Sequence, residues 1–158
     1  MRIEEYPMRM SEREIADRQA IDDIIGRSQI CHLAMCDEGQ PYIIPLNFGY
    51  DGEHIFFHGA TEGRKIDVLK KNNRVCIAFE VVGDLIPGEE ACGWSMIYES
   101  VIAFGRARIL EKTDEKHSAL RCIMRQYSNE IWSFPEHAVS KTSIFQVDIE
   151  EISGKRRQ

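Results

Sequence analysis

The spacing of apolar and polar residues predicts a series of short β-strands joined by tight turns. In six segments, apolar residues alternate with polar ones or form short runs rich in Val, Ile and Phe, as is typical of strands. We expect these strands at residues 29–36, 41–50, 54–58, 74–82, 96–111 and 142–152. Asp51 and Gly52 separate the second strand from the third, and this dipeptide favours a two-residue hairpin turn.

Three other segments carry the spacing of amphipathic helices. Ser11 followed by Glu14 matches a capping box, which predicts a helix that begins there and ends near Gly26. A second helix is expected at residues 63–72. The third follows Thr113, interpreted as its N-cap because acidic residues fill the next turn. Irregular loops are expected at residues 83–93 and 128–141.

Many short strands and few helices predict a mainly β fold, a small antiparallel barrel with flanking helices. The strands do not alternate regularly with helices, and neither GxGxxG nor GxxxxGK[ST] is present, which argues against a Rossmann or P-loop domain. At 158 residues the chain suits one domain. Within it we expect residues 1–10 to form a loose arm and residues 155–158 a solvated basic tail.

Composition narrows the class of protein. Hydrophobic residues make up 43% of the chain and charged residues 29%, as is typical of a soluble globular protein. The net charge of -6 argues against a nucleic-acid partner. No segment is long and apolar enough for a signal peptide or a membrane span, and an odd number of cysteines, five, fits a reducing compartment. We therefore expect a cytoplasmic protein without a membrane partner.

The first candidate for chemistry is an anion site at the start of the second helix. Gly63, Arg64 and Lys65 follow a strand and a turn and open this helix. Backbone amides are unpaired at a helix N-terminus, and the helix dipole favours negative charge there. Arg64 would grip a phosphate with two parallel donors, and Lys65 would add a point charge. The same residues equally fit a solvated basic helix start, so both interpretations stay open.

Two polar residues stand within otherwise apolar strands. His58 ends the third strand beside Gly59 and Ala60, whose small size would let a flat ligand approach the backbone. A histidine bonded to a neighbouring backbone group fits this pattern as well. Asn47 lies within the second strand, where a buried amide needs partners from the backbone or from the ring edge of a ligand.

A further candidate is the segment that follows the loop at residues 83–93. It combines aromatic rings with hydroxyl groups, which suits a planar heterocycle through stacking and edge bonding. An aromatic cluster in the core or at an interface explains the same pattern. We find no metal site and no catalytic nucleophile, because CxxC, HExxH and GxSxG are all missing. The residues of this segment are Trp94, Ser95, Tyr98 and Ser100.

Taken together, these segments resemble a known family. Residues 41–50, 57–60 and 63–65 are similar to the flavin-binding split barrels related to pyridoxamine phosphate oxidase. Residues 87–101 resemble the nitroimidazole-resistance (Nim) branch of that family. The resemblance extends over residues 11–154.

The resemblance implies a six-stranded antiparallel split β-barrel that forms a homodimer with a flavin at the interface. FMN is the usual ligand of such barrels, FAD is an alternative, and relatives also use a deazaflavin or haem. Gly63, Arg64 and Lys65 would hold the phosphate. The residues implied to border the flavin ring are Pro45, Leu46, Asn47, His58, Gly59 and Ala60, completed from the partner chain by Trp94, Ser95, Tyr98 and Ser100.

The activity implied is flavin-dependent reduction of a small electrophile, such as a nitroaromatic. The flavin would carry out the electron or hydride transfer, so the protein would need no nucleophile of its own. His58 is the candidate for a catalytic proton donor. Two alternatives stay open, namely a flavin store or sensor without turnover, and a haem-binding barrel with a histidine as axial ligand.

Overall fold

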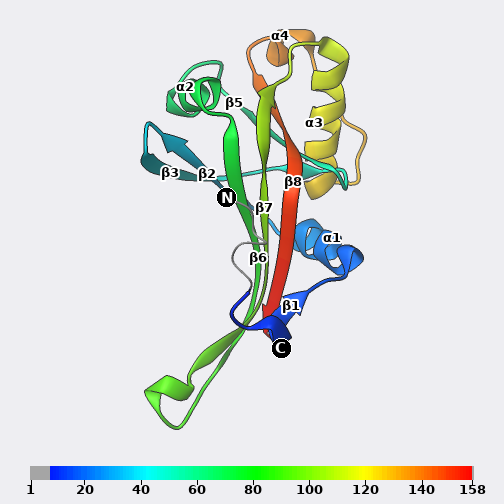
Figure 1. Ribbon diagram of the computed structural model, residues 1–158. Coiled ribbons are helices and arrows are strands. Elements are labelled where there is room, and N and C mark those ends of the chain that lie inside the picture. The colour runs from blue at the N-terminus through cyan, green and yellow to red at the C-terminus, as the bar shows by residue number, and fades with distance from the viewer. Residues whose placement is uncertain (1–7, 158) are drawn as a thin grey trace.

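The strands form one antiparallel sheet that makes an open barrel (Figure 1). The computed structural model describes residues 8–157. Neighbouring strands follow the order β3-β2-β6-β7-β8-β5-β4, and β1 pairs with β8. The strands are β1 (Glu14–Ile15), β2 (Cys31–Asp37), β3 (Gln40–Leu46), β4 (Gly49–Tyr50), β5 (His54–Gly59), β6 (Arg74–Ile86), β7 (Ser95–Ile109) and β8 (Ser143–Arg157). The helices are α1 (Arg18–Arg27), α2 (Arg64–Lys71), α3 (Thr113–Tyr127) and α4 (Glu136–Val139).

The mainly β fold with flanking helices is confirmed, but the sheet has eight strands where six were predicted. The two additional strands, β1 and β4, have two residues each. A strand of two residues shows no alternation of apolar and polar positions, so the sequence pattern does not reveal it. Among the described helices, none has the length and apolar character that crossing a bilayer demands.

Along the long strands, every second side chain points into the barrel, and side chains on the outer face of β5 and β8 pack against α3. The barrel interior contains the largest fully buried side chains, which include Phe48, Phe57, Phe79, Phe145, Leu33 and Ile77. Residues that point the opposite way from β5 and β8 pack against α3. This second cluster consists of Phe56, Leu110, Ala119, Cys122, Ile123 and Ile144.

The strand expected at residues 41–50 is divided in two. β3 and β4 are separated by a break of two residues. At this break the Phe48 amide donates a hydrogen bond to Tyr127 Oη (3.0 Å). Gly49 then lies so close to α3 that a Cβ on it would stand 2.5 Å from the Ile123 backbone nitrogen. Contacts with α3 therefore replace continuous strand pairing here.

The first helix begins later than the capping box predicts. Ser11–Arg13 is a single 3-10 turn, after which β1 pairs with β8. Asp17 caps α1 instead, and its carboxylate accepts a hydrogen bond from the Ala20 amide at 3.0 Å. Strand pairing with the end of the chain thus overrides the local capping signal. Most of the expected N-terminal arm, residues 1–7, lies outside the described residues.

The third helix and the loop after it also differ from the prediction. Lys112 is the N-cap of α3, so Thr113 is its first helical residue and does not cap it. The region 128–141 is irregular except for α4, a helix of four residues that follows Pro135.

The end of the chain is a strand, so the predicted solvated tail at residues 155–158 is wrong. β8 continues to Arg157, and its last three residues pair with β7 from Tyr98 to Ser100. The apolar alternation stops near Ile152, but backbone pairing continues without it. Residue 158 lies outside the described part of the chain.

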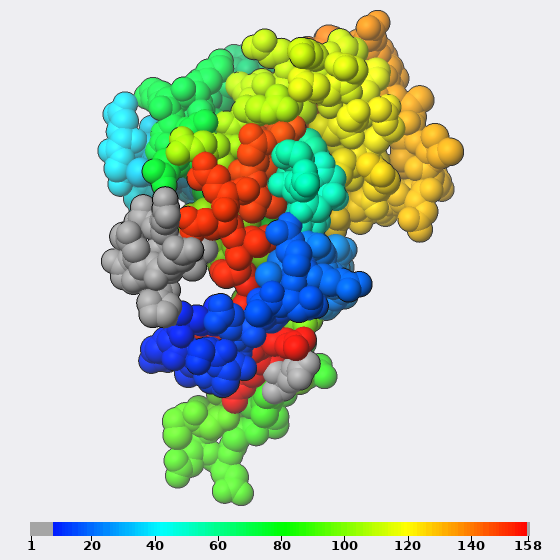
Figure 2. Space-filling view, turned by 45° about the vertical axis from the view of Figure 1, so that its right-hand side comes forward, coloured from blue at the N-terminus to red at the C-terminus, as the bar shows by residue number. Residues whose placement is uncertain are grey.

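β6 and β7 extend beyond the barrel as a two-stranded projection, which we call the ribbon (residues 82–98). Figures 1 and 2 show it, in green, projecting from the body of the protein. The loop expected at residues 83–93 is therefore shorter than predicted, because Leu85 and Ile86 pair with β7 beyond a register shift. Large apolar side chains stay exposed along the ribbon, namely Val82, Leu85, Trp94, Met96 and Ile97.

Candidate functional site

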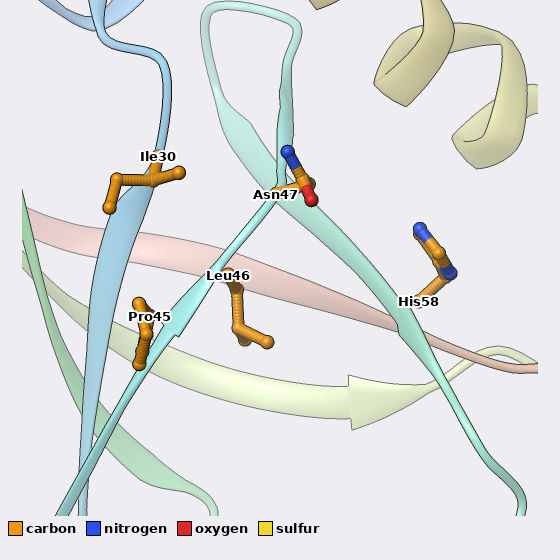
Figure 3. Close-up of a pocket in the computed structure, with 5 residues that line it drawn as sticks. All are labelled: Ile30, Pro45, Leu46, Asn47 and His58. Carbon is orange, nitrogen blue, oxygen red and sulfur yellow. The ribbon is translucent and has the colours of Figure 1, made fainter.

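A pocket of about 280 Å³ lies where the two sides of the split barrel approach each other (Figure 3). One side is the end of β3 and the other is β5, which stand near opposite edges of the sheet. The pocket is lined by Ile30, Pro45, Leu46, Asn47 and His58. The structure thus brings together four of the residues that the family resemblance implies. Ile30 was missed, because the sequence places it within a predicted strand, where an apolar residue carries no chemical signal.

Asn47 occupies the break between β3 and β4 and is exposed, so the prediction of a buried strand amide is wrong. Within residues 8–157 its side chain forms no hydrogen bond with the protein. The amide therefore has both donor and acceptor capacity available at the edge of the pocket.

His58 faces the pocket from β5 (Figure 3). Partial burial of the ring lowers its pKa, and the positive charge of Lys65 lowers that pKa further. The imidazole is therefore neutral at pH 7, and one ring nitrogen donates while the other accepts.

Lys65 reaches back from α2 toward the end of β5, where Gly59 makes room for it. A Cβ at Gly59 would stand 2.7 Å from Lys65 Nζ. The ammonium also lies 5.6 Å from the centroid of the Phe145 ring. The small size of Gly59 therefore accommodates a lysine of the same chain, which differs from the predicted role of admitting a flat ligand. Ala60, the next residue, is exposed after the strand.

No acidic side chain among residues 8–157 compensates the charge of Lys65. The side chain is half-buried, and desolvation alone lowers its pKa, with no acidic side chain acting in the opposite direction. It forms no ion pair within the described residues. Lys65 also stands in the first turn of α2, where the helix dipole is unfavourable to a cation. This arrangement favours an anion beside the ammonium.

The backbone at the start of α2 also offers unpaired amide groups to an anion. Gly63 is the N-cap with φ +123°, a conformation that favours glycine. The first helical bonds run from the amides of Ile66 and Asp67 to the Gly63 carbonyl, at 2.9 and 3.2 Å. The amides of Arg64 and Lys65 stand ahead of these bonds, as unpaired donors do at an anion-binding helix terminus.

Arg64 differs from Lys65 although the two are adjacent in sequence. Its guanidinium lies 3.4 Å from Asp37 Oδ2 and 4.3 Å from the centre of the Tyr42 ring. Arg64 is thus already partnered, and it remains half-exposed. Of the two predicted phosphate-binding side chains, only Lys65 has its charge uncompensated within the described residues.

The remaining predicted site residues lie away from the pocket within one chain. Trp94 and Ser95 stand near the tip of the ribbon, and Trp94 is 55% exposed. Tyr98 and Ser100 lie at its base, where the Ser100 hydroxyl donates to the Lys155 carbonyl at 3.5 Å. None of the four lines the pocket.

The family model described as pyridoxamine 5'-phosphate oxidase matches residues 17–156 of this chain. The chain belongs to the pyridoxamine 5'-phosphate oxidase family. The resemblance inferred from the sequence is thereby confirmed, and so is the split-barrel fold.

Two solved structures and one curated protein are similar to this chain. A protein from Bacteroides thetaiotaomicron named for 5-nitroimidazole antibiotic resistance is 35% identical, with a TM-score of 0.83, over 90% of this chain and 86% of its own. A FAD and haem binding protein from Mycobacterium smegmatis has a TM-score of 0.83 at 18% identity, over 92% of this chain and 74% of its own. An uncharacterized protein from Rhizobium meliloti is 22% identical over 103 residues, which cover 65% of this chain and 61% of that relative.

Proposed function

We propose that this protein binds a flavin nucleotide, with FMN as the preferred ligand, and that Lys65 binds its phosphate. The observation that carries the proposal is the half-buried ammonium of Lys65, which has no acidic partner among residues 8–157, stands at a helix N-terminus and acts electrostatically on His58 of the pocket. A phosphate group would supply the missing negative charge. It would also accept hydrogen bonds from the amides of Arg64 and Lys65.

The chemistry of the pocket supports a ring of the flavin type. Pro45, Leu46 and Ile30 offer apolar surface to a planar ring. Asn47 and the neutral His58 provide donors and acceptors for its polar edge. A few polar groups among apolar walls are typical of cofactor pockets.

We further propose that the working unit is a homodimer. The pocket of about 280 Å³ is smaller than the roughly 300–1,000 Å³ common for ligand sites. The ribbon meanwhile leaves Val82, Leu85 and Trp94 exposed, and exposed apolar patches mark interaction surfaces. A second copy that covers the ribbon would receive Trp94, Ser95, Tyr98 and Ser100 at its own pocket.

The activity we propose is reduction of a small electrophile such as a nitroaromatic. Bound flavin supplies the hydride or electron transfer. The chain contributes binding and orientation, and the neutral His58 would donate a hydrogen bond from its ring N–H to the substrate or to the flavin. The similarity to the Bacteroides protein named for nitroimidazole resistance supports this substrate class.

A haem-binding barrel is the second candidate, because the similar Mycobacterium structure binds FAD and haem by its name. In this chain the neutral His58 would be the axial ligand. A flavin store or sensor without turnover is the third candidate.

Parallel titrations of the full chain with FMN, FAD, riboflavin and haem separate these functions. We expect FMN to bind more tightly than riboflavin, and the bound flavin to lose its absorption when a nicotinamide reductant is added and to regain it with a nitroaromatic. Bound flavin that no reductant bleaches would leave only the store or sensor. A Soret band with haem, lost in His58→Ala, together with no response to any flavin would contradict the flavin proposal.

A further inference from the structure

Tyr127, the last residue of α3, bonds through its hydroxyl group to two neighbouring segments that line the pocket. The hydroxyl accepts a hydrogen bond from the Phe48 amide at 3.0 Å. It donates one to the Gln29 carbonyl at 2.9 Å. Phe48 directly follows Asn47 in the chain, and Gln29 directly precedes Ile30, and both Asn47 and Ile30 line the pocket.

The rest of the last turn of α3 holds the same two segments. The Gln126 side-chain amide lies 3.1 Å from the Ser28 carbonyl, within the segment that leads to Ile30. It also approaches the carbonyls at the end of α1. On the other side, Gly49 lies against the α3 backbone at Ile123 without space for a side chain. α3 therefore holds the ends of both segments, and it also packs against β5, which carries His58 on the other side of the pocket.

We propose that Tyr127 is a positioning residue that ties the Ile30 and Asn47 segments to α3 and so sets their separation from His58 on β5. A hydroxyl suits this position because it donates one hydrogen bond and accepts another at the same oxygen. Replacing it would leave the Phe48 amide and the Gln29 carbonyl without their partner. The two segments would then be held together by the pairing of Cys31 with Leu46 at the ends of β2 and β3, and no longer through this hydroxyl to α3. That this separation sets the fit of a flavin ring rests on the function proposed above.

The variant Tyr127→Phe tests the proposal because it keeps the ring and removes only the hydroxyl. Tyr50→Phe is the matched control, since the Tyr50 hydroxyl also bonds a distant segment, α1, through Asp22 and Arg18, but does not line the pocket. Amide hydrogen exchange is measured in the ligand-free full chain. In Tyr127→Phe we expect exchange at least about tenfold faster at the amides of both Cys31 and Leu46, the last pair of β2 and β3. In Tyr50→Phe we expect both to keep their wild-type rates.

Acceleration confined to the Phe48 amide would overturn the proposal, because the ends of β2 and β3 would then not depend on Tyr127. Equal acceleration in both variants would overturn it as well, because the effect would then reflect general stability. This comparison needs no ligand, so it decides the role of Tyr127 even if the protein binds no flavin.

Affinity provides the second measurement. Tyr127 acts on the ring side of the site, so Tyr127→Phe is expected to weaken riboflavin and FMN by the same factor, about tenfold. Tyr50→Phe is expected to leave both affinities unchanged. Wild-type affinity of Tyr127→Phe for riboflavin would overturn the positioning role, whereas failure of the wild-type protein to bind either flavin would contradict the proposed function itself.

Discussion

The pocket and the ribbon carry the two halves of the site that the family resemblance implies, and they are supported in opposite ways. The pocket residues stand on a filled barrel, and the break that holds Asn47 is bonded to α3. The ribbon consists of two strands that project beyond the barrel with Val82, Leu85 and Trp94 exposed. One chain therefore preorganises its pocket, whereas the ribbon leaves its apolar side chains exposed, where the proposed second copy would cover them.

The largest effect is expected from a charge on the ribbon. Leu85→Glu should weaken association of the two copies by at least about a hundredfold, because a buried unpaired carboxylate is costly. Ile131, which is fully exposed in the loop after α3, provides the control Ile131→Glu. Sedimentation over a range of concentrations measures the dissociation constant of the dimer. Unchanged association of Leu85→Glu would show that the ribbon is not the interface.

On the barrel side, Gly49→Ala tests the contact between β4 and α3. The added Cβ would meet the Ile123 backbone at 2.5 Å, so we expect a loss of about 2 kcal/mol in the free energy of unfolding. Gly26→Ala is the control, since its Cβ would meet no atom within 4 Å. Urea denaturation of both variants gives the comparison. Equal stability of the two would mean that α3 is free to move away from β4.

A smaller and more selective effect is expected from Gly59→Ala. The new Cβ would displace the Lys65 ammonium, which is the end of a flexible side chain, so stability should change little. FMN affinity should fall by about tenfold while riboflavin affinity stays close to that of the wild type. Isothermal titration with both ligands checks this expectation. Equal loss of FMN and riboflavin affinity would mean that Gly59 contributes to binding of the flavin ring and not of the phosphate.

The smallest effect concerns the pH dependence of stability. The pKa of His58 is lowered from its ordinary value of 6.5, so below that pH the unfolded chain takes up a proton more readily than the folded one. The free energy of unfolding should therefore fall as the pH drops from 6.5 toward the lowered pKa, and it should be constant with respect to His58 above 6.5. Urea denaturation of wild type and His58→Gln between pH 5 and 8 measures this difference. A slope that is identical in both would exclude His58 as its source.

The barrel was predictable from the sequence because alternation and turn residues reflect it directly. The first and last residues of the helices and strands were not predictable, because tertiary contacts determine them. Pairing of β1 with β8 replaces the helix start predicted at Ser11, and a hydrogen bond from Phe48 to α3 interrupts the predicted second strand. Residues such as Ile30 and Tyr127 carry no recognisable motif, and only their positions in the fold reveal their place at the pocket.

Arg64 and Lys65 show that the sequence also does not predict which side chain of the candidate site is available for a ligand. Sequence spacing treats Arg64 and Lys65 alike, as a basic pair at a helix start. The fold brings Asp37 and Tyr42 to Arg64 and brings no acidic group to Lys65. Which cation remains available for a phosphate therefore depends on contacts that lie far apart in sequence.

The most direct measurement of the central claim is the affinity of Lys65→Ala for FMN and for riboflavin, followed by flavin fluorescence. Lys70→Ala is the control, because Lys70 is an exposed lysine of the same helix. A charge-assisted contact contributes about 1.5–3 kcal/mol, so FMN binding should weaken by at least about tenfold in Lys65→Ala alone while riboflavin binding is preserved. Equal loss of both ligands, or no loss of FMN, would contradict the assignment of Lys65 to the flavin phosphate.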